Sequence, residues 1–229
     1  MKLLSLPVLA AATLVIPGLA LSGDYCFEGV GDSPDCGHTG YIFAYGGGFF
    51  GYDVEGHEPR FPSNEKMDMD SGYIFGGGGG LYLDFLNGSR LEVEGIHARN
   101  KIGRIRSDIF GGAGFVDYGF RGDVETNSVM VNLLKEIPFC NFTGYFGGGV
   151  GFAEQNITIY DPANQGNPES DAALTYQFIA GVDVPVSDCV DLFVQYKLIG
   201  INETHYERID LVIDRHVTNN LVFGARMSF

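Results

Sequence analysis

The amino-acid sequence predicts an all-β fold, an eight-stranded antiparallel up-and-down transmembrane β-barrel. After Thr39 the chain falls into eight segments of alternating apolar and polar residues, and this period of two places one strand face against apolar surroundings. The connections between these segments are alternately short and long, as in transmembrane barrels. Beyond the first 20 residues no stretch approaches the roughly eighteen apolar residues that a spanning helix needs.

Each predicted strand can supply the about nine to eleven tilted residues that cross a membrane. Alternation is clearest in the last strand, where Phe223, Ala225 and Met227 share the apolar face. The strands are predicted at 39–52, 71–86, 89–100, 126–137, 142–154, 172–186, 190–203 and 217–229. Long polar loops are predicted at 53–70, 101–125, 155–171 and 204–216. With an even number of strands, both chain ends lie on the side of the short turns.

Residues 1–20 are typical of a secretory signal peptide. Lys2 precedes an apolar run over residues 3–16, and residues 18–20 offer small side chains for cleavage. A transmembrane helix is the alternative, which Pro7 and Pro17 disfavour. Residues 21–38 are then a short N-terminal segment on the periplasmic side, and residues 39–229 form the barrel.

Four cysteines remain after the export signal: Cys26, Cys36, Cys140 and Cys189. An even number in an exported chain predicts disulfides. Three pairings are possible, and proximity favours Cys26 with Cys36, which leaves Cys140 with Cys189. Since no Cys-x-x-Cys spacing is present, no metal site is predicted.

Composition excludes other functions. The net charge of −15 argues against nucleic acid as a partner, because phosphate backbones are bound by Lys and Arg. Residues 46–51 match the dinucleotide motif G-x-G-x-x-G, but no helix follows to face a pyrophosphate, so no cofactor is predicted. Glycine is instead expected to relieve crowding in a narrow barrel.

Charged residues on the face opposite to the apolar one are predicted to point into the barrel. An interior of eight strands is just wide enough for side chains, so a packed network of ion pairs is favoured over a small cation-preferring pore. The predicted network contains Asp84, Arg90, Glu92, Glu94, Glu136, Asp183, Asp191, Lys197 and Arg226.

A basic cluster follows the third predicted strand. It consists of Arg99, Lys101, Arg104 and Arg106. Clustered bases suit the phosphates of anionic lipid head groups or lipopolysaccharide, and a solvated loop is an equally open interpretation.

Several segments carry a resemblance to a known family. They are ETNSVMVNL at 125–133, TGYFGGGVGFA at 143–153, YQFIAGVDVPVSD at 176–188, LFVQYKLIG at 192–200 and the terminal NNLVFGARMSF. The chain resembles the small alphaproteobacterial outer-membrane β-barrel and surface-antigen proteins, which are porin-like. The resemblance implies an outer-membrane location and assigns the terminal Phe229 to recognition by the assembly machinery. It says little about function, because the barrel and not a shared site unites such proteins.

The expected role is that of a structural, surface-exposed interaction protein that is not an enzyme. Outer-membrane lipid or lipopolysaccharide and an extracellular partner bound through the loops are the expected partners. A small-solute diffusion pore is the alternative, and a lipid-acting enzyme is less favoured. Barrel lipases use a His-x-Ser pair on one strand face, whereas here His97-Ala98-Arg99 lacks the nucleophile, so no catalytic residue is predicted.

Overall fold

The computed structural model describes residues 39–49, 52–58, 63–86, 88–108, 116–117, 121–160, 166–206 and 211–229. The predicted signal peptide, the segment 21–38 and the predicted Cys26–Cys36 pair lie outside these residues. Within the described ranges, no helix has both the length and the apolar character needed to cross a membrane.

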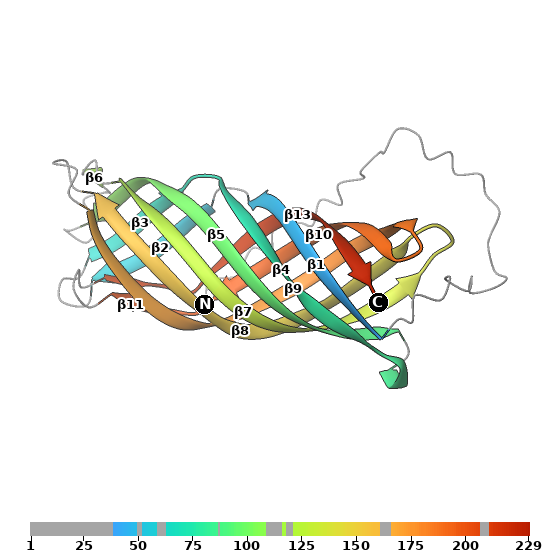
Figure 1. Ribbon diagram of the computed structural model, residues 1–229. Coiled ribbons are helices and arrows are strands. Elements are labelled where there is room, and N and C mark those ends of the chain that lie inside the picture. The colour runs from blue at the N-terminus through green and yellow to red at the C-terminus, as the bar shows by residue number, and fades with distance from the viewer. Residues whose placement is uncertain are drawn as a thin grey trace, which may run out of the picture. The chain divides into compact units, whose positions relative to one another are not determined.

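Eight long strands form a closed antiparallel barrel (Figure 1). In order around the barrel they are β1 (Gly40–Phe49), β4 (Gly72–Leu83), β5 (Ser89–Asp108), β7 (Arg121–Pro138), β8 (Thr143–Tyr160), β9 (Gly166–Ser187), β10 (Val190–Ile201) and β13 (His216–Ser228). Each pairs with the next, and β13 closes the ring on β1 in a register that runs from Tyr41↔Ser228 to Phe49↔Asn220. The predicted fold class is confirmed.

The segments predicted as long loops contain further strands, so that prediction is wrong in part. β5, β7, β8 and β9 continue through them, and five short strands add to the same sheet. These are β2 (Tyr52–Glu58), β3 (Ser63–Met69), β6 (Val116–Asp117), β11 (Thr204–Tyr206) and β12 (Leu211–Ile213). Where lipid ends, the outer face of a strand meets water, while residues such as Ile102, Val124 and Ile157 remain buried on the inner face. The apolar outer face that marks the other strands is therefore missing.

The short strands build an upper tier on the end of the barrel opposite to the C-terminus (Figure 1). β2 pairs with β3 and with β12, while β3 pairs with β5 and β11 pairs with β12. On the other side, Asn202 N–H donates to Leu174 O at 3.1 Å and His205 N–H donates to the Asp171 carboxylate at 2.7 Å. These bonds hold β11 beside β9, so the wall of the barrel continues beyond the eight-stranded part.

The short turns lie together at the other end. The 3-10 helix η1 (Asp84–Leu86) and Gly88 join β4 to β5, and Gly88 has a φ of 71°, which glycine adopts without a steric penalty. The end of β7 is bonded to Gly88 through Glu136 N–H, and the turn after β9 is bonded to the end of β13 through Cys189 O. This arrangement places the chain's C-terminus on the short-turn side, as predicted.

The two described cysteines lie in separate turns. Cys140 lies between β7 and β8, and Cys189 lies between β9 and β10. Since neighbouring strands are about 4.8 Å apart, the two turns are separated by roughly 10 Å, more than the approximately 7 Å that a disulfide tolerates between Cα atoms. Cys140 is not disulfide-bonded, so the predicted pairing of Cys140 with Cys189 is wrong.

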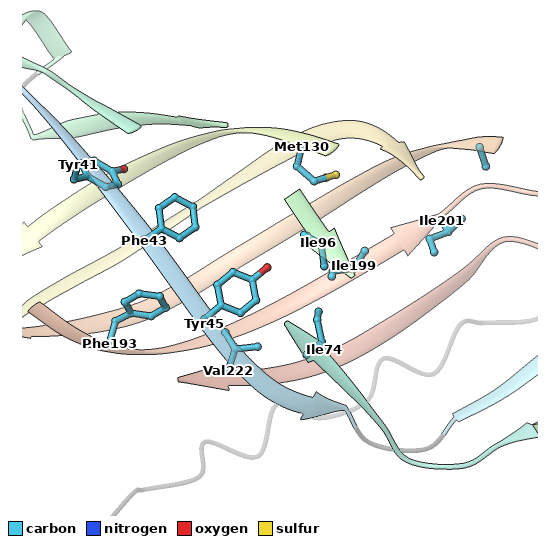
Figure 2. Packing of buried hydrophobic residues seen from close by; sticks show 11 residues of the cluster. Tyr41, Phe43, Tyr45, Ile74, Ile96, Met130, Phe193, Ile199, Ile201 and Val222 are labelled. Carbon is cyan, nitrogen blue, oxygen red and sulfur yellow. The ribbon is translucent and has the colours of Figure 1, made fainter. Parts of the chain in front are cut away.

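The polarity of the barrel is the inverse of that of a soluble protein. Large apolar side chains lie exposed on the outer face, such as Phe152 at 70% and Val129 at 61% exposure. Aromatic and aliphatic side chains also fill part of the interior, where Tyr41, Phe43 and Tyr45 of β1 belong to one buried cluster with Phe193 and Val222 (Figure 2). An apolar outer belt around a filled interior matches a barrel whose solvent is lipid.

Glycines 76–80 of β4 make room for the inner tyrosines. A Cβ atom at Gly76 would lie 2.4 Å from the Tyr45 hydroxyl, and one at Gly80 would lie 2.3 Å from the Tyr41 hydroxyl. Neither distance is compatible with a side chain larger than hydrogen. The glycine tract therefore relieves crowding in the narrow interior, as the sequence indicated.

We expect Gly78→Val to block correct pairing of β4 with β5, because its Cβ would lie 2.0 Å from the backbone oxygen of Val93. The free energy of unfolding should fall by at least about 2 kcal/mol, as for other overpacked interiors. Heat-modifiable migration after refolding, followed across a denaturant series, measures this. Gly46→Val is the matched control, since nothing lies within 4 Å of a Cβ at Gly46; equal losses in both variants would contradict the explanation.

Candidate functional site: the filled interior and the outer wall

Arg90 of β5 organises the interior near the short turns. Its Nη1 atom lies 2.5 Å from Glu136 Oε1 and 3.1 Å from Asp183 Oδ2, and its Nε lies 3.2 Å from Glu92 Oε1. The Arg90 side chain is fully buried. Three carboxylates from three different strands thus surround one guanidinium, which is the arrangement that a buried charge requires.

Arg226 and two tyrosines complete this layer. Arg226 of β13 donates to the same Asp183 carboxylate, and its Cζ lies 4.9 Å from the centre of the Tyr41 ring. The Cζ of Arg90 lies 4.2 Å from the centre of the Tyr145 ring. Both distances are typical of cation–π contacts, which gain strength when water is excluded. Two cations and two rings therefore occupy the cross-section of the barrel together.

A second polar layer surrounds Lys197 of β10. Its Nζ contacts the Glu94 carboxylate and donates to the Tyr45 hydroxyl at 3.1 Å. Glu94 also accepts hydrogen bonds from Asn132 at 2.9 Å and from Gln177 at 2.7 Å. Lys197 is fully buried and Glu94 nearly so, so this network lies in the interior of the barrel.

A third layer lies where the upper tier begins. Gln155 Nε2 lies 3.3 Å from His216 Nε2, and the Gln155 carbonyl oxygen accepts from Tyr206 at 3.4 Å and from Thr204 at 3.5 Å. Burial raises the pKa of the Tyr206 phenol to about 12, so this hydroxyl stays protonated and remains a donor. A cavity of about 30 Å³ adjoins this layer and is lined by Gln155, Ile96, Ser128 and Thr175 among others, which is enough for a water molecule or two.

Most of the predicted interior charges come together in these layers. Arg90, Glu92, Asp183 and Arg226 form the first layer with the half-buried Glu136, and Glu94 and Lys197 form the second. Asp191 lies half-buried at the start of β10, and Asp84 belongs to η1 instead of a strand, with a side chain outside the described part. Sequence reasoning missed Asn132, Gln177 and Gln155, although the same alternation that located the charges also places these amides inside.

The predicted basic cluster is only partly assembled. Arg99 and Lys101 are exposed on the outer wall, and Arg99 lies 3.6 Å from Asp123 of β7. The side chains of Arg104 and Arg106 are outside the described part; their backbones pair with Asp68 and Lys66 of β3. The four bases therefore belong to a strand rather than to a loop, and two of them are described as outward-facing.

His97 lies on the outer wall beside polar side chains. Its Nδ1 lies 2.7 Å from Asn127 Oδ1 and 3.8 Å from Glu125 Oε1. Neither contact supplies the hydroxyl nucleophile that an acyl-transfer site needs. Among the side chains that the structure describes, no group of three His, Cys, Asp or Glu residues could hold a metal ion.

Comparison with known proteins agrees with this architecture. No family model matches the chain. A relative named "Outer membrane protein" from Gluconacetobacter diazotrophicus is 28% identical over 185 residues, which cover 71% of this chain and 47% of the relative. The chain thus spans about half the length of that relative. The similarity to this relative and the exposed apolar belt together place the protein in the outer membrane. The protein is a bacterial outer-membrane β-barrel.

Solved structures show the same fold. Neisserial surface protein A matches with a TM-score of 0.50 and 15% identity, over 83% of this chain and 97% of that one. The outer membrane protease OmpT from Escherichia coli matches with a TM-score of 0.52 and 8% identity, over 84% and 97%. A major outer membrane protein from Thermus thermophilus matches with a TM-score of 0.50 and 11% identity, over 84% and 100%. Because outer-membrane barrels of this fold include a protease, the fold alone does not decide the activity.

We expect Lys197→Met to destabilise the outer-membrane barrel by about 3–5 kcal/mol, because it leaves Glu94 buried without its cation. The double variant Lys197→Met/Glu94→Gln also removes the charge of Glu94 and should recover much of the lost stability. Urea unfolding of refolded protein in micelles measures both. Lys135→Met near the short turns is the control, with a change within about 0.5 kcal/mol; a double variant less stable than Lys197→Met would contradict the charge argument.

Proposed function

We propose that the protein is a structural, surface-exposed interaction protein of the outer membrane and not a pore or an enzyme. The filled interior is the observation that carries the proposal. Arg90, Lys197 and Arg226 are buried to 3% exposure or less, and each is engaged by carboxylates and by aromatic rings. Such filling of a narrow interior supports a plugged barrel over a diffusion pore.

The upper tier supports a role at the cell surface. On β9 the apolar outer face ends at Leu174, and the eight residues between Leu174 and the start of the strand at Gly166 extend beyond it. With about 3.3 Å per residue and a tilt of roughly 40°, this part rises about 20 Å above the belt. Four neighbouring strands share this height, so the tier offers a stiff surface to an extracellular partner. Neisserial surface protein A, a structural neighbour, is by its name a surface protein.

The interior layers predict that the refolded wild-type protein is silent in a planar bilayer. The double variant Arg90→Ala/Arg226→Ala should produce discrete conductance steps, because it removes two guanidinium groups from the interior of the barrel. Migration as a heat-modifiable barrel is the control for folding in both samples. Discrete steps in the wild-type protein would favour the diffusion pore over our proposal.

The orientation of the upper tier predicts a labelling pattern in intact cells. The exposed side chain of His205 lies in this tier, whereas the exposed Cys140 lies in a short turn at the opposite end. We expect a membrane-impermeant maleimide to label His205→Cys while the wild-type protein, which keeps Cys140, stays unlabelled. Permeabilised cells provide the control, since Cys140 should then react. Labelling of the wild-type protein in intact cells would invert the orientation and overturn the surface role of the tier.

A further inference from the structure

A groove of about 630 Å³ crosses the outer wall of the barrel over β4, β5, β7 and β8 and reaches β9. Its floor consists of backbone where glycines replace side chains, at Gly77 of β4 and Gly95 of β5. Phe75 and Phe152, which are 51% and 70% exposed, border it on opposite strands. The groove therefore has an apolar floor and aromatic walls on the surface that faces lipid.

The groove lies where the outer wall changes from apolar to polar. One row in the register consists of Gly77, Gly95, Val129 and Phe152, and the next row toward the upper tier consists of Phe75, His97, Asn127 and Glu154. All eight residues line the groove. With the upper tier at the extracellular end, an orientation on which this inference rests and which the proposed function supplies, this change of polarity marks the outer edge of the membrane. A molecule bound in the groove would place its apolar part beside the first row and its polar part beside the second.

The polar border offers both acceptors and cations. Glu154 is exposed, and Asn127 holds His97 in place through their 2.7 Å contact. Arg99 follows His97 on the same strand face, about 7 Å further along the strand and, with a tilt of roughly 40°, about 5 Å further from the membrane centre. Lys101 follows Arg99. Both basic side chains are exposed. Carboxylate and amide oxygens can accept from sugar hydroxyl or amide N–H groups, and the two bases above them suit phosphate.

We propose that this groove binds a phosphorylated glycolipid of the outer leaflet, of the lipopolysaccharide class. An acyl chain lies on the glycine floor between Phe75 and Phe152, the sugar contacts Asn127 and Glu154, and a phosphate contacts Arg99 and Lys101. A phospholipid with a glycerol head group would also fill the floor, but its two head-group hydroxyls offer fewer donors to Asn127 and Glu154 than the hydroxyl and amide groups of a phosphorylated sugar do. The site lies on the outer wall, so it does not depend on whether the interior conducts.

The test uses the full-length refolded protein in micelles, with purified lipopolysaccharide or phosphatidylglycerol as the probe and native mass spectrometry as the readout. Gly95→Leu fills the groove, and the fold has room for it because a Cβ at Gly95 meets only the Gly77 oxygen at 3.9 Å. We expect its affinity for lipopolysaccharide to fall about tenfold, as if roughly two methylene groups had left the site. Phe152→Ala, which removes a wall, should act in the same direction.

Matched controls separate the site from general effects of the substitutions. Gly46→Leu adds the same side chain in the register row of Phe75 but outside the groove, and it should bind as the wild type does. Arg99→Glu/Lys101→Glu should weaken the binding of lipopolysaccharide, whereas Lys135→Glu at the short-turn end should not. Equal affinity of Gly95→Leu and wild type would overturn the site. Equal retention of phosphatidylglycerol and lipopolysaccharide by the wild type would overturn the glycolipid as its occupant.

Discussion

The closure of the sheet is the constraint on which the rest of this structure depends. Hydrocarbon offers no hydrogen-bond partners, so a spanning sheet cannot leave a free edge. The pairing of β13 with β1 removes the last edge, and the pairing of β5 with β7 joins the two halves of the ring. With only eight strands the enclosed space is narrow, and the glycine tract of β4 and the stacked interior layers both follow from that narrowness.

A narrow interior also determines how charge is handled. Charged side chains that point inward leave bulk water, and each must then find a counter-charge, a hydrogen bond or an aromatic face within a few ångströms. Asp183 meets two guanidinium groups, and Glu94 meets an ammonium group and two amides. The same contacts that satisfy these groups fill much of the interior, and for this reason our proposals turn to the outer wall and the upper tier.

The outer surface changes its chemistry along the strands without a break in the backbone. β5, β7, β8 and β9 carry apolar residues through the belt, then a row with His97, Asn127 and Glu154, and then a polar wall that faces water. One continuous sheet therefore presents a lipid-facing surface, a groove at the change of polarity and a polar tier beyond it. The hydrogen-bonded ladder makes these three surfaces rigid with respect to one another, which suits recognition at a membrane surface better than mobile loops would.

The sequence by itself determined the eight spanning strands, their antiparallel order and the face on which Arg90, Glu94 and Lys197 lie, because alternation with a period of two is a local property. It could not reveal β2, β3 or the upper parts of β8 and β9, since the apolar outer face that marks a spanning strand is missing where water replaces lipid. Only the tertiary structure decided which charges meet. Lys197 and Glu94 are 103 residues apart, and Cys140 is kept from Cys189 by two intervening strands. Such contacts depend on register and closure, which are properties of the whole barrel.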